Sequence, residues 1–334
     1  MIIGIDVGGA NTKAATSDGS FLTSIHAPLW RNKAILYDVL YEIEKEIDET
    51  EIASAGAVMT GEICGCFETK GEGVSYIKKA VCRVFGDVKF LDNQCIFRNS
   101  SDVDRDLLSF ASTNWLASAR FIADEYKDVI FVDIGSTTTD VIPITNGRIK
   151  AGRSDLERLK SGELIYSGVS RTSVSCLLDR IYMKGEECKT SSEHFATTAD
   201  VYLIIGRIKK EDIGCESLNR YCYPFTGEEE KNRISAMRRL ARVLCSDLEE
   251  IGEEGVVHIA EQVEEAQVNE LITSLERISE KYGLKNVVSV GIGDFIAEES
   301  SQALNLNFLS LSSVYGKRLS AVFPAYAVAK LLDD

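Results

Sequence analysis

Two short stretches of this sequence carry the residue types that bind phosphate groups and a divalent metal ion. Residues 2–19 read IIGIDVGGANTKAATSDG, and residues 131–147 read FVDIGSTTTDVIPITNG. In each, glycines and small polar residues follow an apolar run that ends in aspartate. Glycine lets the backbone approach a ligand closely, so that N–H groups of the turn can point at phosphate oxygens. An aspartate at the strand end can hold Mg²⁺ directly or through its waters. The residues expected to form this site are Asp6, Gly8, Gly9, Asn11, Thr12, Asp133, Gly135, Ser136, Thr137 and Thr138, with Asp6 and Asp133 as the metal ligands.

The two stretches are copies of one unit. Asp133 follows Asp6, and Thr139 follows Thr12, by the same offset of 127 residues (133 − 6 and 139 − 12). In both copies an Asp-Gly or Asn-Gly pair closes a hairpin. Matching hairpins at this distance predict two related half-domains rather than a short-period repeat. We therefore expect two loops that face each other across a cleft and grip a diphosphate or triphosphate from both sides.

Two other phosphate-binding motifs are absent from the sequence. A dinucleotide-binding fingerprint needs its glycines to open a helix, whereas Gly8-Gly9 leads into a second strand. The chain also has no G-x-x-x-x-G-K-[ST] segment, which excludes a P-loop protein.

The apolar pattern predicts an α/β chain with two ribonuclease H-like halves, residues 1–125 and 126–334, and a cleft between them. Residues of about 151–285 exceed what the second half needs, and we expect them to be a largely helical insertion. The remaining expected elements are, in order, a helix at 33–49, a strand at 52–60, a helix at 75–85, a strand at 88–92, a helix at 106–126, strands at 287–295 and 307–311, and a closing helix at 319–332 that could pack back on the first half.

Composition limits the partners. The net charge of −15 argues against nucleic acid or an anionic membrane surface. Nine scattered cysteines do not form a disulfide framework, and three histidines make a zinc site a poor expectation. With no signal peptide and no apolar run long enough to cross a membrane, we expect a cytoplasmic protein. Whether it forms a homo-oligomer is left open.

Two further segments carry charges that could act on a ligand. Glu62 and Lys70 lie in TGEICGCFETKGEGV (60–74), at a strand's C-terminal end, where open α/β sheets place ligands. Glu62 could be a general base and Lys70 an anion clamp, or both could lie on a solvated loop. In YSGVSRTSV (166–174), Arg171 could bind a phosphate or carboxylate bidentately, or the segment could cap a helix.

The last candidates are weaker signals. In EHFATTADVYLIIG (193–206), Asp200 is the expected polar contact, while His194 is more typical of a packed or exposed side chain. Gly291 and Gly293 end one strand and open a helix, where a nucleobase or ribose could lie against exposed backbone. Glycine is also common at strand–helix turns that bind nothing.

Taken in this order, the motifs resemble the actin, sugar-kinase and heat-shock ATPase superfamily. GIDVGGANTK and VDIGSTTTDV are more closely similar to its hydantoinase/oxoprolinase family. The segments 60–74, 166–174 and 193–203 resemble the archaeal branch of that family that acts in methanofuran biosynthesis. The resemblance implies a transferase that joins an aminomethylfuran diphosphate to the phenol of γ-glutamyltyramine, releases pyrophosphate and uses Mg²⁺.

The same resemblance implies roles for individual residues. Where relatives read GGTFTD, this chain has Ala10, Asn11 and Lys13, and the added cation suits a diphosphate leaving group better than ATP hydrolysis. Lys13 is expected to stabilise the departing pyrophosphate, and either Glu62 or Asp140 to take the phenol proton. The residues assigned to Mg²⁺ and the diphosphate are Asp6, Gly8, Gly9, Thr12, Asp133, Gly135, Ser136, Thr137 and Asp140.

Two other functions remain open at the level of sequence. An ATP-dependent enzyme of the same fold, either a small-molecule kinase or a hydantoinase-type amide hydrolase, would form ADP. A nucleotide-sensing module would bind its ligand without turnover, although no peptide-binding domain or filament signature accompanies the two hairpins.

Overall fold

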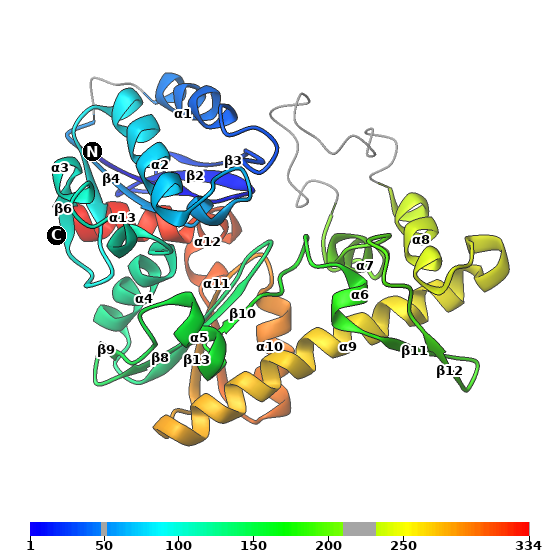
Figure 1. Ribbon diagram of the computed structural model, residues 1–334. Coiled ribbons are helices and arrows are strands. Elements are labelled where there is room, and N and C mark those ends of the chain that lie inside the picture. The colour runs from blue at the N-terminus through cyan, green and yellow to red at the C-terminus, as the bar shows by residue number, and fades with distance from the viewer. Residues whose placement is uncertain (48–51, 210–231, 334) are drawn as a thin grey trace.

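The computed structural model describes residues 1–47, 52–209 and 232–333, and two six-stranded sheets organise them (Figure 1). The first sheet has the order β3-β2-β1-β4-β5-β6. Its neighbours β2 and β3 run antiparallel to their partners, while β4 and β5 run parallel to β1. The strands are β1 (Ile2–Val7), β2 (Asn11–Thr16), β3 (Leu22–His26), β4 (Ser54–Met59), β5 (Val88–Leu91) and β6 (Phe97–Asn99).

The second sheet repeats this arrangement. Its order is β10-β8-β7-β13-β14, with β9 paired to β8 off this path. When β9 is set aside, both sheets have their third, second, first, fourth and fifth strands along the chain as successive neighbours. The directions match as well, because β8 and β10 are antiparallel and β13 and β14 parallel. The strands are β7 (Val129–Ile134), β8 (Thr139–Thr145), β9 (Arg148–Ile149), β10 (Leu164–Ile165), β13 (Asn286–Gly291) and β14 (Asn307–Ser310). The expected duplicated α/β fold is confirmed.

Strand alternation decides which residues face the other sheet. In β1, Ile3, Ile5 and Val7 pack on one side against α1 (Ile35–Glu46) and α2 (Lys70–Phe85). Because successive side chains in a strand point to opposite faces, Gly4 and Asp6 lie on the other side. We call this side the inner face of the first sheet.

The second sheet has an inner face of its own. Ile130 and Val132 pack in the core that α9 (Leu248–Tyr282) and α10 (Asp294–Ala303) cover. Val129 and Phe131 point the opposite way, into a cluster with α4 (Asn114–Glu125) and α13 (Phe323–Asp333). Asp133 continues this second series, so it shares the inner face with Phe131.

The helices α4 and α13 therefore lie between the two inner faces. The helix α13 packs along β1, β2 and β4 of the first sheet and also against α4, while α4 contacts β7 and β8 of the second. Phe323 joins the two sides, since its ring lies 6.4 Å from that of Phe131 and 5.6 Å from that of Phe121. In Figure 1, α13 and α4 lie between the two sheets, on the left of the view.

Two glycines allow α13 to approach the first sheet closely. A Cβ atom on Gly4 would lie 1.9 Å from the Ala325 carbonyl oxygen, and one on Gly56 would lie 2.8 Å from Val328. Gly4 and Gly56 are register partners on neighbouring strands, so together they form a flat patch. The alanines of FPAYAVAKLLD are small enough to pack on it.

The segment between β10 and β13 projects from the second sheet. It holds α6 (Val174–Leu177), α7 (Thr198–Ile204), α8 (Arg233–Ala241) and the hairpin of β11 (Arg180–Met183) and β12 (Glu186–Lys189), all supported by α9. Gly252, with φ of +77°, interrupts α9 near its start. One strand in the range expected to be inserted, β10, is in fact a member of the sheet.

Two expected helices are divided. In place of one helix at 106–126, a short turn (Leu107–Phe110) precedes α4, because Ser112 between them has a left-handed φ of +53°. The closing helix is split at Val322 into α12 (Lys317–Ala321) and α13. The remaining short helices are α3 (Ser100–Val103), α5 (Asp155–Ser161) and α11 (Ser312–Tyr315).

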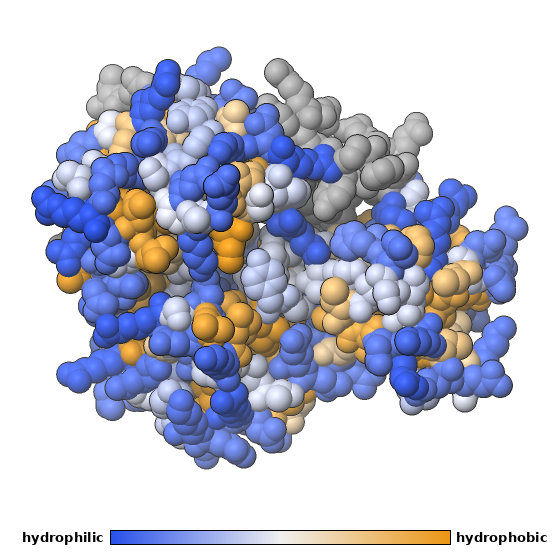
Figure 2. All heavy atoms as spheres, in the orientation of Figure 1, coloured by the Kyte–Doolittle hydropathy of each residue, from blue (hydrophilic) through white to orange (hydrophobic). Residues whose placement is uncertain are grey.

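Hydrophilic side chains cover most of the face shown in Figure 2, and hydrophobic ones form small separate groups. Within the described ranges, no helix combines the length and the apolar character that crossing a bilayer requires.

The packing of α13 on Gly4 leads to a stability prediction. Gly4→Ala would place a methyl group inside the Ala325 backbone, which cannot move without displacing α13, and overpacking of this kind costs about 3 kcal/mol of unfolding free energy. Gly65→Ala is the matched control, because its Cβ would meet no atom within 4 Å. Chemical denaturation of both variants measures the difference, and equal stabilities would contradict the described packing.

Candidate active site

Asp6 and Asp133 occupy equivalent places at the ends of β1 and β7, one on each inner face. Their cross-strand neighbours are also equivalent. Asp6 pairs with Lys13 on β2, and Asp133 pairs with Asp140 on β8. Directly opposed residues of antiparallel strands share a face, so all four side chains point into the space between the sheets. At this equivalent position, the first half has Lys13 and the second half has Asp140.

The two loops that follow these aspartates have the same conformation. The Gly8 N–H donates to the Asn11 carbonyl over 3.0 Å, and the Gly135 N–H donates to the Thr138 carbonyl over 2.9 Å. These bonds are again 127 residues apart. In the second loop, Ser136 and Thr137 are half-buried and their hydroxyls lie 3.4 Å apart.

Each loop is supported by a segment that the sequence also singled out. A Cβ on Gly61 would lie 3.1 Å from the Gly8 carbonyl oxygen, and one on Gly9 would lie 2.7 Å from the Cys64 sulfur. On the second loop, the Val169 N–H donates to the Gly135 carbonyl, while the N–H groups that follow it donate to Ser136. The segments 60–74 and 166–174 therefore hold the loops in position.

Burial changes the acidity of both aspartates. Burial raises the pKa of Asp6 to about 6, a rise that nearby Lys13 and a hydrogen bond from Asn114 oppose. Burial raises the pKa of Asp133 to about 7, and Lys13 again opposes the rise while Asp140 and Asp6 add to it. Because Lys13 acts on both carboxyls and Asp6 acts on Asp133, the three groups are close enough to form one charged cluster.

One oxygen of this cluster, Asp6 Oδ1, has no hydrogen-bond partner among the described residues, and Asp6 is only 2% exposed. Thr12 Oγ1 also lacks a partner among these residues, but Thr12 is the register partner of Val7, so its side chain points to the opposite face of the sheet. Buried polar atoms without partners are uncommon in native proteins and are expected where a ligand completes the site. Oxygen donors are also what Mg²⁺ prefers.

The protein does not supply a full set of metal ligands. Within the described residues, no group of three or more His, Cys, Asp or Glu side chains is arranged to hold a metal ion. Mg²⁺ usually takes one or two carboxylates and completes its shell with water and substrate phosphates. Asp6 and Asp133 fit such a partial site.

Glu62 lies at the same edge of the first sheet, in a short turn (Gly61–Ile63) after β4. It is fully buried, its Oε1 accepts a hydrogen bond from Ser112 over 2.9 Å, and its Oε2 has no partner. Burial raises the pKa of Glu62 to about 7, with Lys70 opposing and Asp155 adding to the rise. An acid that titrates near neutral pH is suited to general acid–base catalysis.

Asp140 is in a different situation from Glu62. Arg158 of α5 forms an ion pair with Asp140 and a second one with Asp155 over 2.9 Å, and its guanidinium carbon lies 4.3 Å from the ring centroid of Trp115. Burial raises the pKa of Asp140, and the Arg158 charge opposes that rise. With one oxygen held by a guanidinium, Asp140 is a poorer base candidate than Glu62.

Lys70 and Arg171 both contact residues across the two sheets. Lys70 Nζ lies 3.1 Å from Asp155 Oδ2, so the cation expected to clamp an anion is engaged by a carboxylate of the second half. The Arg171 guanidinium stacks 3.8 Å from the ring centroid of Trp30, which follows β3 in the first half. Cation–π stacking fixes the plane of the guanidinium.

Asp200 and the glycines at the end of β13 make close contacts within the protein. Asp200 belongs to the capping box of α7 and forms an ion pair with Arg239 over 2.6 Å, so the expected ligand contact is taken up by the protein itself. A Cβ on Gly291 or Gly293 would lie 2.3 Å from Ile134. These glycines allow a close approach to β7, and the expectation that a nucleobase or ribose lies against them stays a prediction.

Several residues around the site have no counterpart in the sequence expectations. Asn114 bonds Asp6, and a chain of contacts links Glu62 through Ser112 and Asp155 to Arg158. The segment Ser-Thr-Asn before α4 is a helix-start signal, which could have marked this position. Nothing local marks the partners from α5.

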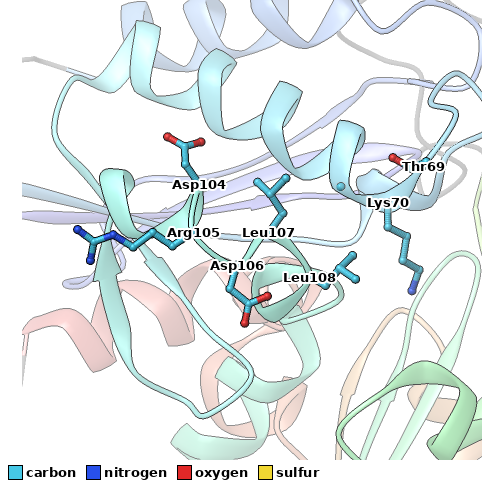
Figure 3. Close-up of a pocket in the computed structure, with 8 residues that line it drawn as sticks. Thr69, Lys70, Asp104, Arg105, Asp106, Leu107 and Leu108 are labelled. Atoms are coloured by element: carbon cyan, nitrogen blue, oxygen red, sulfur yellow. The ribbon is translucent and has the colours of Figure 1, made fainter.

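A hollow lies beside this site. It has a volume of about 650 Å³ and is lined by the start of α2 and by residues 104–108 (Figure 3). Figure 3 shows Lys70 on one side and Arg105 pointing away from it. Asp104 is paired with Lys78, so much of the lining charge is already neutralised.

The raised pKa values predict how stability depends on pH. A buried carboxyl whose pKa is raised binds its proton more tightly in the folded state, so its unfavourable effect grows as pH rises from about 4 to about 7. In the presence of a chelator, Asp133→Asn should therefore raise the melting temperature at pH 8 by a few degrees, on the order of 3 °C per kcal/mol, and change it little at pH 4. Thermal unfolding at both pH values measures this. The exposed Glu280→Gln is the control, and equal effects at the two pH values would contradict the prediction.

Known proteins with similar sequences identify the family of this chain. The chain is 35% identical over 337 residues to the (4-{4-[2-(gamma-L-glutamylamino)ethyl]phenoxymethyl}furan-2-yl)methanamine synthase of Methanocaldococcus jannaschii, an alignment that covers 100% of this chain and 98% of that protein. It is 36% identical over 221 residues to the synthase of the same name from Methanococcus vannielii, covering 65% of this chain and 96% of that protein.

Solved structures with similar folds are more distant. The ROK family glucokinase from Streptomyces griseus, in complex with glucose and AMPPNP, aligns at 11% identity with a TM-score of 0.48, covering 99% of this chain and 98% of that one. The ROK hexokinase from Thermus thermophilus aligns at 13% identity with a TM-score of 0.45, covering 100% and 99%. The sequence model of hydantoinase/oxoprolinase matches residues 54–334, and the chain belongs to the hydantoinase/oxoprolinase family.

Proposed function

We propose that this protein joins a furanylmethyl diphosphate to the phenol of γ-glutamyltyramine, forming an aryl ether and releasing pyrophosphate. The name of the two synthase relatives describes a product in which a phenoxymethyl bridge connects these parts. The similarity to the first relative extends over the whole chain, including both hairpins, so it covers every residue of the candidate site.

The observation that carries the proposal is the cluster of Asp6, Lys13 and Asp133 between the sheets. The buried Asp6 Oδ1, which has no hydrogen-bond partner among the described residues, suits a hard cation, and Lys13 adds a positive charge beside it. When bound, Mg²⁺ would neutralise negative charge on the diphosphate oxygens. Asp6 and Asp133 would hold it, and the turn N–H groups of the two loops would position the phosphates.

The remaining chemistry is carried by the substrate and by Lys13. A furan ring donates electron density to its attached CH₂ group, which favours breaking the bond to the diphosphate oxygen. Lys13 would stabilise the negative charge that develops on that oxygen, and a cation placed where charge develops in the transition state contributes several kcal/mol.

Glu62 is the proposed base that takes the phenol proton. It is buried at the same sheet edge as Asp6, has a free carboxylate oxygen, and holds a pKa of about 7 that allows both protonation states near neutral pH. Asp140 was the other candidate, and its ion pair with Arg158 favours a role in holding the second loop.

The test follows phosphorus compounds by ³¹P nuclear magnetic resonance. The protein is incubated with Mg²⁺ and either the furanylmethyl diphosphate or ATP, with and without γ-glutamyltyramine. Pyrophosphate release that requires the phenol is the expected result. ADP formation would overturn it in favour of a kinase or amide hydrolase, and binding without turnover would favour a sensing module.

Removing either carboxylate charge should abolish turnover. Asp6→Asn and Asp133→Asn each keep the shape of the side chain but weaken metal and diphosphate binding, so we expect a loss of about a thousandfold in phenol-dependent pyrophosphate release. Circular dichroism checks that the fold is intact, and Glu280→Gln is the charge-matched control. Near-normal activity in either variant would refute the metal assignment.

A further inference from the structure

Ser112 lies where one hydroxyl meets two carboxyl groups. Its Oγ is 2.9 Å from Glu62 Oε1 and 2.7 Å from Asp155 Oδ2. A serine hydroxyl has a single proton, so it can donate to only one of them at a time. The other bond requires that carboxyl to be the donor, and hence protonated.

The backbone at Ser112 supports a role for its side chain. Its φ of +53° lies in the left-handed region, which glycine adopts freely and which is unfavourable for a residue with a Cβ. Strained residues of this kind concentrate at functional sites, where the surrounding structure holds them in place. Here the strained conformation aims the hydroxyl between the two acids.

The charges around the pair make the two acids unequal. Although burial opposes it, hydrogen bonding from Ser112 and the charges of Arg158 and Lys70 lower the pKa of Asp155. Asp155 therefore stays ionised. Glu62 is fully buried and titrates near neutral pH; the groups that act on it are Lys70 from α2, Asp155 from α5 and Ser112, and its own charge acts on the nearby Cys64 thiol.

We propose that Ser112 is a positioning residue whose hydroxyl proton turns from Glu62 to Asp155 when Glu62 accepts the phenol proton. This inference rests on the proposed function, in which Glu62 is the base. While Glu62 is a carboxylate, Ser112 donates to it. As the phenol oxygen bonds to the furanylmethyl carbon and the bond to the diphosphate breaks, the phenol proton moves to Glu62. The carboxyl group of Glu62 then turns so that its protonated oxygen faces Ser112 Oγ, Glu62 donates to Ser112, and Ser112 donates to Asp155. Glu62 later returns its proton to water.

The arrangement also connects the base to the other half of the molecule. Glu62 and Ser112 belong to the first half of the chain, whereas Asp155 begins α5 in the second. The alternative partner for the serine proton is therefore available only while the two halves are in contact.

The test compares two variants whose effects should have opposite signs. The base is active when deprotonated, so kcat/KM for pyrophosphate release rises with pH through the titration of Glu62. Ser112→Gly removes a donor to the carboxylate and should move this rise up by about one pH unit. Asp155→Asn removes a competing negative acceptor and should move it down by about one unit.

The double variant distinguishes the proposed change of hydrogen-bond partner at Ser112 from simple charge repulsion between Asp155 and Glu62. If the hydroxyl transmits the effect of Asp155, then Asp155→Asn should shift the profile much less in the Ser112→Gly background than in the wild type. An equal shift in both backgrounds would overturn the proposal. Ser112→Ala repeats the test without relaxing the backbone, and Asn305→Gly, at another left-handed position with φ of +54°, should leave the profile unchanged.

A measurement without substrate keeps this inference distinct from the proposed function. Infrared spectra of protein with ¹³C-labelled glutamate, recorded without metal across the pH range, follow the Glu62 carboxyl band, which Glu62→Gln identifies. We expect this titration to move to higher pH in Ser112→Gly, and an unchanged titration would overturn the switch. A wild-type protein without synthase activity would instead refute the proposed function.

Discussion

Negative charge held between two sheets is the constraint on which the rest of this structure depends. Asp6 and Asp133 lie on inner faces that α4 and α13 otherwise fill with apolar side chains, and carboxylates in such surroundings are costly to ionise. Lys13 offsets part of that cost for both. Keeping acids here lowers stability, and destabilising groups of this kind are typical of functional sites.

The two halves of the duplicated fold carry different charges at equivalent positions. Both loops keep the same closing hydrogen bond, yet the position after the conserved threonine of the repeat is Lys13 in one half and Asp140 in the other. Lys13 leaves its charge in the shared space, whereas Asp140 is neutralised by Arg158. In the proposed function, the first half would supply the cation that stabilises the leaving group, while Asp155 of the second half contacts Glu62 through Ser112.

Local patterns predicted the parts of the structure that local forces determine. The repeat at an offset of 127 residues gave both hairpins, and with them the related order of the two sheets. It could not give β10, which is only two residues long and has no periodicity to read. The bond between Ser112 and Asp155 joins residues 43 apart and depends on how the sheets pack. Gly291 shows a second limit of prediction from sequence. A glycine that makes room for a ligand cannot be distinguished by sequence from one that makes room for a neighbouring residue, here Ile134.

The helix α13 packs against β1, so the end of the described chain completes the core of its beginning. During synthesis on a ribosome, the inner face of the first sheet stays uncovered until residues 323–333 have been made. The first half therefore cannot complete its folding as a separate unit before the second half is synthesised. Gly4 and Gly56 leave part of this uncovered face as backbone without side chains. This reduces the exposed apolar area to which another nascent chain could bind.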